Sequence, residues 1–567
     1  PLGLALAGCA RSTAPAAPGT PAVEPGLDDP SRVQLPSPTP TPPPSPTPIP
    51  ATATAAARAG VAPPVGTPAA AAATATVARP AQFTWALEAD PVSLDAHQQT
   101  NFSSTLAYEH VYESLTAFDD KLNIVPSLAS AWELDKDGLS YTFHLESGAR
   151  FQEGAEVSAE DVRWSFARIL APENHSPWAT SWYEPLRSVV AVDPRTVRVE
   201  LKRPYPQLPA ILASLRGAVV YPKDVDQRGL LTTGAIGTGP FKLKEYRPND
   251  RLIYERNRDY RAPGLPRIDG MVARIIPDEE ERIAGLRSGE LDYATLSPEG
   301  VRRLGTGGGH QLVAGPRAWL ATMELPYNTH TAFRDSRVRR AFSLAIDREE
   351  IIRKSLLGAG VLSGNVPTGF ADWPLPEADL RPLLRRDVGQ ARQLLAGAGF
   401  PNGKGFPEVK LIASPDYPEF VASALAVQAQ LKELGLNLDV QRVDWATYIA
   451  LVNKGETQLG FSASTFYPDP DLYLWPQGHS KSLHGVRGYH HPNQEELDKT
   501  LDAARVWTGP REERRELFRK ADRMMLEDPP WLTLYVAANV EVLSPRVKGY
   551  VGSFTGRRPG FRSISLG

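Results

Sequence analysis

The sequence has a single cysteine, Cys9, among 567 residues. One thiol excludes an intramolecular disulfide, a zinc site built from paired CxxC motifs and a CxxC redox pair. The chain also lacks any run of about 18 apolar residues, so no segment is long enough to span a membrane as a helix. Basic and acidic residues nearly balance, at 62 against 65, which gives no electrostatic reason to expect a nucleic-acid partner.

Motifs of several enzyme classes are absent as well. The sequence contains no GxSxG, no HExxH and no GxxxxGK[ST], and GFPNGKG at 399–405 lacks two required positions of a phosphate loop. A glycosidase would need two opposed carboxylates, which a sequence alone cannot place. We therefore predict that the chain is not an enzyme and binds no cofactor, with a hydrolase as the alternative.

The cysteine follows a short apolar stretch. Residues 1–8, PLGLALAG, look like the tail of a secretory h-region, and with no basic n-region we expect the chain to begin inside its signal peptide. Leu6-Ala7-Gly8-Cys9 resembles the lipobox of bacterial lipoproteins, in which the cysteine sulfur receives a diacylglycerol. Each buried CH₂ of such a lipid contributes about 0.8 kcal/mol to membrane binding. We predict that Cys9 is the lipid attachment point; a chance buried cysteine is the alternative.

A proline-rich segment comes next. Residues 10–80 contain 18 prolines and no aromatic residue, and SPTPTPPPSPTPIP at 37–50 favours a semi-rigid spacer. Such a composition cannot bury enough apolar surface to offset the entropy of ordering. As a flexible coil the segment would average roughly 40–50 Å from end to end. We predict a disordered tether that holds the following domain away from a membrane.

Alternating and helical patterns begin near Phe83. Period-two alternation predicts strands, and three-to-four spacing predicts helices, one of which carries a capping box formed by Ser158 and Asp161. The mixed order predicts an α/β protein. The expected strands are 141–145, 195–201 and 436–443, and the expected helices are 158–170, 335–357 (capped by Asp335), 419–434, 495–504 and 512–526.

Five blocks then identify a family. The chain resembles the family 5 extracellular solute-binding proteins, which include the oligopeptide- and dipeptide-binding components of ABC importers, from about residue 85 to 560. The blocks, in the family's order, are DPVSLDAHQQTNFSSTLAYEHVYESLTAFDDKLNIVPSLASAWELDKDG (90–138), YTFHLESGARFQEGAEVSAEDVRWSFARI (141–169), IGTGPFKLKEYRPNDRLIYERNRDY (236–260), YNTHTAFRDSRVRRAFSLAIDREEII (327–352) and TFYPDPDLYLW (465–475).

The resemblance implies a two-lobed, periplasmic-binding-protein-like clamshell of type II, in the large peptide-binding subclass. Lobe I would take 81–315, with an extra subdomain at about 115–230, and would be completed by 536–567. Lobe II would take 316–535, and crossovers near 315 and 535 would form the hinge. Ligand would lie in the cleft between the lobes, and closure of the lobes would expose the surface that the permease recognises.

The stretch GFSASTFYPDPDLYLW, 460–475, departs from the peptide-binding pattern. In peptide-binding relatives an aspartate before this tyrosine pairs with the α-amino group of the peptide, whereas this chain has Phe466 before Tyr467. A carboxylate compensates an ammonium, while a phenyl ring offers only a weaker cation–π contact. Peptides remain the leading ligand class, followed by sugars and then metal complexes; a shift of one residue in the alignment is the alternative. We expect Asp469 and Asp471 to cap a local turn.

Other ligand contacts follow from approximate family position, and core packing is the alternative for each aromatic residue. The predicted ligand-binding residues are Phe102, Ser103, Ser104, Trp182, Tyr183, Trp319, Tyr327, Asn328, Trp445, Phe466 and Tyr467.

Two charged clusters are also present. His479, His484, His490 and His491 fall within 13 residues, but the segment resembles a polar surface loop, so we predict no metal site. Arg337, Arg339 and Arg340 follow Asp335, and we expect solvated positions or ion pairs, with permease contact as the alternative.

These observations predict a lipid-anchored substrate-binding protein of an ABC importer. Its partners would be a small-molecule or short peptide ligand, the permease subunits and the membrane through the N-terminal lipid. We predict an extracytoplasmic monomer without a nucleic-acid partner. A non-transport surface adhesion lipoprotein is the remaining alternative.

Overall fold

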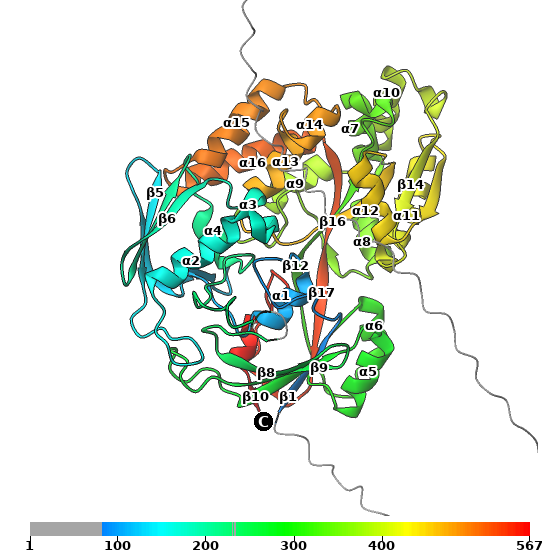
Figure 1. The fold of residues 1–567 in the computed structure, drawn as a ribbon. Helices are drawn as coiled ribbons and strands as arrows, with labels where there is room; N and C mark the ends of the chain where they lie inside the picture. Colours follow the sequence, from blue (N-terminus) through cyan, green and yellow to red (C-terminus); the bar gives the residue numbers. More distant parts are fainter. Residues whose placement is uncertain (1–81, 230, 232–233, 457) are drawn as a thin grey trace, which may run out of the picture. The chain divides into compact units, whose positions relative to one another are not determined.

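The computed structural model describes residues 82–567 except 230, 232–233 and 457 (Figure 1). The predicted lipobox, Cys9 and the tether at 10–80 lie outside the described residues. Within the described part of the chain, no helix is both long and apolar enough to cross a membrane.

An eleven-stranded sheet connects the two halves of the structure. Its order is β15-β14-β16-β12-β17-β11-β1-β10-β9-β8, and β13 also pairs with β17. The two longest strands, β12 (Gln311–Glu324) and β17 (Trp531–Leu543), pair antiparallel and span the positions near 315 and 535 where the sequence predicts crossovers. We call the elements on the β11 side lobe I and those on the β16 side lobe II.

Lobe I joins the beginning and the end of the described chain. The aromatic side chains of Phe83, Trp85, Tyr254 and Phe561 are buried together in its core. Its elements are β1 (Phe83–Leu87), α1 (Phe102–Tyr108), β8 (Phe241–Arg247), β9 (Arg251–Arg256), β10 (Gly270–Ile275), α5 (Glu279–Ser288), β11 (Tyr293–Leu296), α6 (Pro298–Leu304), β18 (Val547–Lys548) and β19 (Ser565–Leu566).

A four-stranded antiparallel sheet in the order β4-β5-β7-β6 forms a subdomain with its own core. The predicted strands at 141–145 and 195–201 are confirmed, as is the predicted helix at 158–170. The elements are β2 (Thr116–Phe118), β3 (Ile124–Pro126), β4 (Ala129–Leu134), β5 (Ser140–Leu145), α2 (Ala159–Leu170), α3 (Pro177–Ser181), β6 (Leu186–Asp193), β7 (Thr196–Leu201) and α4 (Leu208–Ala213).

The capping box of α2 provides a test of local stability. The Ser158 hydroxyl accepts from the backbone N–H of Asp161, and the Asp161 carboxylate accepts from the backbone N–H of Ser158. Ser158→Ala should therefore lower the free energy of unfolding by about 1 kcal/mol, measured by urea denaturation. Ser181→Ala, at an exposed position, is the control and should change it by less than about 0.5 kcal/mol. If Ser158→Ala lowered the free energy of unfolding no more than Ser181→Ala does, the cap would have no specific stabilising role.

Lobe II places helices against a partly parallel sheet. Strand β14 pairs parallel with both β15 and β16, and helix α11 buries Phe420, Val427 and Leu431 in the core beside them. The elements up to β16 are α7 (Ser336–Ala345), α8 (Arg348–Ser355), β13 (Gly360–Val361), α9 (Glu377–Leu384), α10 (Val388–Gly397), β14 (Val409–Ala413), α11 (Pro418–Lys432), β15 (Leu438–Arg442), α12 (Trp445–Lys454) and β16 (Leu459–Ser464).

The single long helix predicted for 335–357 is wrong. The structure has two helices, α7 and α8, because the backbone of Ile346 and Asp347 is extended rather than helical. The Asp347 carboxylate accepts from the backbone N–H of Glu350 and so caps a new helix. An Asp three residues before a Glu is an N-terminal signal that the apolar periodicity concealed.

The last part of lobe II is helical. It contains α13 (Asp471–Gly478), α14 (Leu483–Arg487), α15 (Gln494–Val506) and α16 (Arg511–Glu527), so the helices predicted at 495–504 and 512–526 are confirmed. The polar surface loop expected around the histidines is wrong in part, because α13 and α14 occupy this stretch and His479 and His491 are buried.

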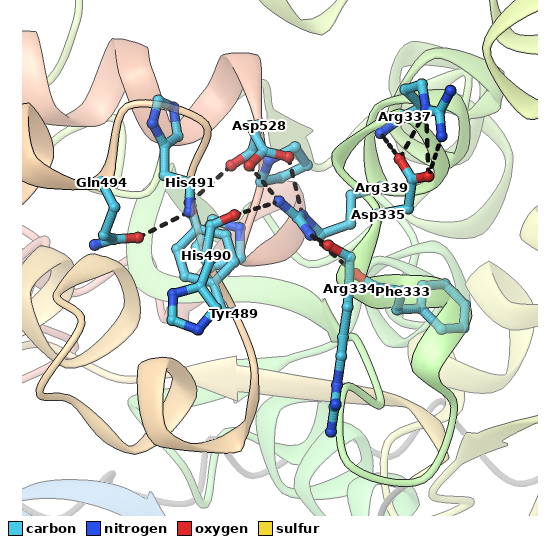
Figure 2. Close-up of polar contacts among 12 residues, drawn as sticks. Phe333, Arg334, Asp335, Arg337, Arg339, Tyr489, His490, His491, Gln494 and Asp528 are labelled. Carbon is cyan, nitrogen blue, oxygen red and sulfur yellow. Dashed lines mark hydrogen bonds and ion pairs between the residues drawn. The ribbon is translucent and has the colours of Figure 1, made fainter. Parts of the chain in front are cut away.

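Figure 2 shows Arg337 and Arg339, two of the three arginines that follow Asp335. The exposed Arg337 pairs with Asp335, whose carboxylate also caps α7, so the expected cap and ion pair are confirmed. Arg339 also forms an ion pair, with Asp528, but it is fully buried rather than solvated. Its Nε donates to Asp528 Oδ1 at 2.9 Å, and its remaining N–H groups reach the second Asp528 oxygen and the carbonyls of Phe333, Arg334 and His490. Arg340 forms no ion pair among the described residues and donates to the carbonyls of Leu383 and Leu526.

Candidate ligand-binding site

The lobes meet along the segment that follows β16. On the subdomain side, Arg216 Nη2 lies 3.5 Å from Thr465 Oγ1 of lobe II, and Gln207 Nε2 lies 3.4 Å from Asp471 Oδ2. On the hinge side, the backbone N–H of Ala318 in β12 donates to Phe554 O of the C-terminal segment at 2.8 Å. Residues far apart in the sequence therefore converge between the two lobes.

Four phenylalanines form an aromatic cluster at this junction. The ring of Phe466 packs edge-on against Phe118 of the subdomain, with centroids 5.6 Å apart, and against Phe370 at 5.3 Å. Phe554 stacks on Phe370 at 6.2 Å and completes the cluster. Phe466 is 5 % exposed. The position at which peptide-binding relatives have an aspartate is thus surrounded by hydrocarbon, and the role of Phe466 in ligand binding stays a prediction.

Arg216 is a partly buried cation at the same junction. Its guanidinium lies over the ring of Trp182, 5.9 Å from the centroid, and burial lowers the pKa of Arg216. Tyr467 and Tyr108 are its principal neighbouring titratable groups. None of the carboxylates in the described residues forms an ion pair with it. A guanidinium in such a position has the geometry to receive a carboxylate from a ligand.

A second group of side chains surrounds Arg317 on β12. The Arg317 guanidinium lies over Phe102 and Trp319, at 5.7 and 5.9 Å from the centroids, and burial lowers the pKa of Arg317. Tyr417 packs against both Trp319 and Trp445, at 5.4 and 5.3 Å. The structure therefore joins three sequence-predicted residues, Phe102, Trp319 and Trp445, through Arg317 and Tyr417.

The other sequence-predicted residues lie in local structure. Tyr183 is buried in the subdomain core, and Tyr327 is buried in the lobe II core, where its hydroxyl donates to Pro530 O. The Ser104 hydroxyl accepts from the backbone N–H groups of Val92 and Ser93. Ser103 donates to Asp90 O, and Asn328 donates to Gly455 O. These five side chains are occupied by contacts within their own lobes.

Asp469 and Asp471 follow the aromatic cluster. Asp469 Oδ1 accepts from the backbone N–H of Asp471 at 3.0 Å, as expected of a local turn. Asp469 also forms a buried, two-bonded ion pair with Arg514. Asp471 contacts Arg505 at 3.3 Å. Both carboxylates thus have partners within lobe II.

Asp471 should make the stability of the protein depend on pH. Burial raises the pKa of its carboxyl to about 6, and the charge of Arg505 acts in the opposite direction. A raised acid pKa favours the folded state at low pH, and this stabilisation is lost as pH rises from about 4 through 6. The loss should be about 3 kcal/mol, and Asp471→Asn should remove this part of the pH dependence in urea denaturation at each pH.

The control for this prediction is Asp120→Asn, because Asp120 is exposed. It should show the same slope of stability against pH as the unmodified protein. The same slope in Asp471→Asn would contradict the prediction.

The four histidines do not converge. His479 stacks on Trp475 with centroids 4.6 Å apart, His491 lies against Met524 O, and burial lowers the pKa of His484 to about 4. Within the described residues, no three His, Cys, Asp or Glu side chains are arranged to hold a metal ion.

Sequence reasoning missed Arg216, Arg317, Tyr417 and three of the four clustered phenylalanines. Arg216 follows the apolar helix α4, in SLRGAVV, and a lone arginine in such a run is a signal that could have identified it. Arg317 precedes Trp319 on a strand that the sequence analysis treated only as a crossover.

Comparison with known proteins supplies the family. Residues 123–484 match the model of the bacterial extracellular solute-binding proteins, family 5 Middle. The chain is 30 % identical to heme-binding protein A of Haemophilus influenzae over 84 % of this chain and 89 % of that protein. It is 27 % identical to the glutathione-binding protein GsiB of Salmonella typhi, over 82 % and 91 % respectively.

Solved structures agree with this match. The periplasmic binding protein DppA of Helicobacter pylori, in complex with the peptide STSA, is 25 % identical, with a TM-score of 0.67 over 85 % of this chain and 98 % of that one. The fold is therefore the two-lobed α/β clamshell that the resemblance implied. The family is extracellular by its description, and the named relatives bind solutes. The chain belongs to family 5 of the bacterial extracellular solute-binding proteins.

Proposed function

We propose that this chain is the substrate-binding component of an ABC importer and captures a peptide or peptide-like solute between its lobes. The observation that carries the proposal is Arg216, a partly buried guanidinium at the lobe junction with no carboxylate partner among the described residues. Burying an uncompensated charge is costly, so a site built around one is stabilised by an anionic ligand.

The remaining side chains suit such a ligand. Aromatic rings of Trp182, Trp319 and Trp445 offer apolar contact, and Arg317 adds a second cation on the hinge side. The relatives are named for heme and glutathione, and both of these molecules carry carboxylates. Phe466 offers no carboxylate for an α-amino group, so we propose that the ligand is oriented by its anionic end.

Ligand contacts from both lobes supply the energy for closure. Shifting an equilibrium between open and closed states from 1:99 to 99:1 requires about 5.5 kcal/mol of differential binding. A carboxylate bound by Arg216 from the subdomain and by groups of lobe II contributes to this difference only when the lobes are together.

We also propose that the chain is a monomeric, extracytoplasmic lipoprotein anchored through Cys9, so that it stays beside the permease subunits at a high effective concentration. Cys9→Ala should move the protein from the membrane fraction to the soluble fraction after cell lysis. The control is the variant Ser12→Ala, which keeps Cys9 and should stay in the membrane fraction. Membrane retention of the Cys9→Ala variant would contradict the anchor.

Native mass spectrometry of the full chain tests the transport proposal. Masses of anionic peptides retained through purification support it, and small-angle scattering should then show compaction when the same solute is added back to the stripped protein. A series of hexose masses would instead identify a sugar receptor, and a nickel or iron complex would identify a chelate receptor. Hydrolysis of a bound peptide, or no compaction with any retained solute, would favour the enzyme or adhesion alternatives.

A further inference from the structure

The end of β12 presents a group of polar side chains that the proposed site does not use. Thr322 and Glu324 are two residues apart on one strand, so their side chains share a face of the sheet. Thr533 lies directly opposite Thr322, and Gly460 lies directly opposite Glu324. Residues directly opposite one another in antiparallel strands also share a face.

Two helices cover this face. A Cβ atom on Gly460 would lie 2.5 Å from the Tyr448 hydroxyl, so Tyr448 of α12 lies over Gly460 and beside Glu324. The ring of His484 in α14 packs against Trp531, the other residue opposite Glu324, with centroids 6.2 Å apart. We name Thr322, Glu324, Tyr448, His484 and Thr533 the Glu324 cluster.

The polar atoms of the Glu324 cluster lack partners. The hydroxyls of Thr322, Tyr448 and Thr533 and the Nδ1 atom of His484 are buried without a hydrogen bond within the described residues. Each of the three hydroxyl side chains is 1 % exposed. Glu324 has no ion pair or side-chain hydrogen bond in the same part of the chain. A buried polar group left unpaired costs about 1–3 kcal/mol, so a cluster of this kind is suited to an occupant.

The charge of the cluster defines the occupant. Burial raises the pKa of Glu324 to about 7, with the charge of Arg487 acting in the opposite direction. Arg487 forms no ion pair with Glu324 in the described residues, and its Nη2 donates to Val452 O at 3.0 Å. Burial lowers the pKa of His484 to about 4, so its ring is neutral at pH 7 and one ring nitrogen is an acceptor. The cluster thus offers one carboxyl group and several acceptors.

We infer that the Glu324 cluster binds the protonated primary amine of a ligand side chain. An ammonium has three donors, no acceptor and a compact charge, which matches a carboxylate surrounded by hydroxyls and an imidazole nitrogen. The inference rests on the proposed function, because it adds a side-chain subsite to the same peptide-like solute. Trp319 and Glu324 are five residues apart on β12, so their side chains lie on opposite faces of the sheet. The Glu324 cluster adjoins the proposed site through Tyr448, whose ring lies 5.5 Å from that of Trp445.

Calorimetry with two tripeptides tests the inference. Ala-Lys-Ala should bind the full chain about tenfold or more tightly than alanyl-norleucyl-alanine, which lacks the ammonium. Binding of Ala-Lys-Ala at pH 7 should also release about half a proton, because the ammonium favours the ionised form of Glu324. The release is measured as the dependence of the binding heat on the ionisation enthalpy of the buffer.

Two variants test the Glu324 cluster and a third is the control. Glu324→Gln should reduce the preference for lysine to less than about threefold and abolish the proton release. Tyr448→Phe removes an unpartnered hydroxyl, so it should weaken the preference without lowering stability. Glu408→Gln, at an exposed position, should leave both readouts unchanged. Equal affinities of the unmodified protein for the two tripeptides, or a lysine preference that survives in Glu324→Gln, would overturn the inference.

A small amine, n-butylammonium, separates this inference from the proposed function. If neither tripeptide binds, the peptide proposal fails, and n-butylammonium chloride then tests the cluster by itself against an equal concentration of potassium chloride. A rise in melting temperature in the unmodified protein that is absent from Glu324→Gln supports the ammonium site. Equal shifts in the two proteins overturn it.

Discussion

Replacing Arg216 with glutamine should weaken binding of the solute recovered from the protein about 100-fold. The substitution removes charge-assisted hydrogen bonds of about 1.5–3 kcal/mol each and leaves the ligand anion unpaired between the lobes. Without ligand, the same substitution removes a partly buried cation that has no carboxylate partner among the described residues. The melting temperature of the unliganded variant should therefore equal or exceed that of the unmodified protein, whereas the rise caused by ligand should disappear.

Arg203→Gln is the matched control, because Arg203 belongs to the same subdomain but pairs with Glu184 near the surface. Isothermal titration should give an affinity within about twofold of the unmodified protein for this control, since exposed ion pairs contribute little. Unchanged affinity in Arg216→Gln would show that Arg216 does not contact the ligand. A large loss of stability without ligand would instead assign it a structural role.

Asp528→Asn should lower the free energy of unfolding by about 3–5 kcal/mol, the largest effect on stability that we predict. The substitution leaves the fully buried guanidinium of Arg339 without its carboxylate partner (Figure 2). The hydrogen bonds from Arg339 to the carbonyls of Phe333 and His490 orient its charge but do not neutralise it. Urea denaturation followed by circular dichroism measures the change.

Arg337→Met provides the comparison within the same helix. It breaks the exposed pair with Asp335, so it should cost less than about 1 kcal/mol. Similar losses in Arg337→Met and Asp528→Asn would show that burial does not determine the contribution of these pairs. The double variant Asp528→Asn with Arg339→Met should recover part of the stability, because the uncompensated charge is then absent.

Local sequence signals were sufficient where one segment determines its own structure. The capping box at Ser158 and the alternation at 141–145 predicted α2 and β5, because caps and side-chain periodicity act over a few residues. The helix predicted at 335–357 failed for a related reason. Its apolar periodicity continues through Ile346, but the local cap at Asp347 starts a second helix.

The candidate site was less accessible from the sequence. Family position led to Phe102, Trp319 and Trp445, yet it could not show that Arg317 and Tyr417 join them, because these contacts depend on how distant segments pack. The partners of Arg339 illustrate the same limit. The sequence of its helix predicts an exposed charged face, and only the fold brings Asp528, 189 residues away, to the Arg339 guanidinium.

The pairing of β17 has a consequence for the order in which this protein is made. Its last residues, 540–543, lie between β12 and β11, so a strand from the end of the chain occupies the middle of the eleven-stranded sheet and borders lobe I. A nascent chain that has just completed lobe II therefore still lacks this central strand, and β11 and β12 have no partner to connect them. Lobe I can finish folding only after synthesis has passed residue 543, which leaves the β17-facing edge of β11 open to chaperones and export machinery until the chain is almost complete.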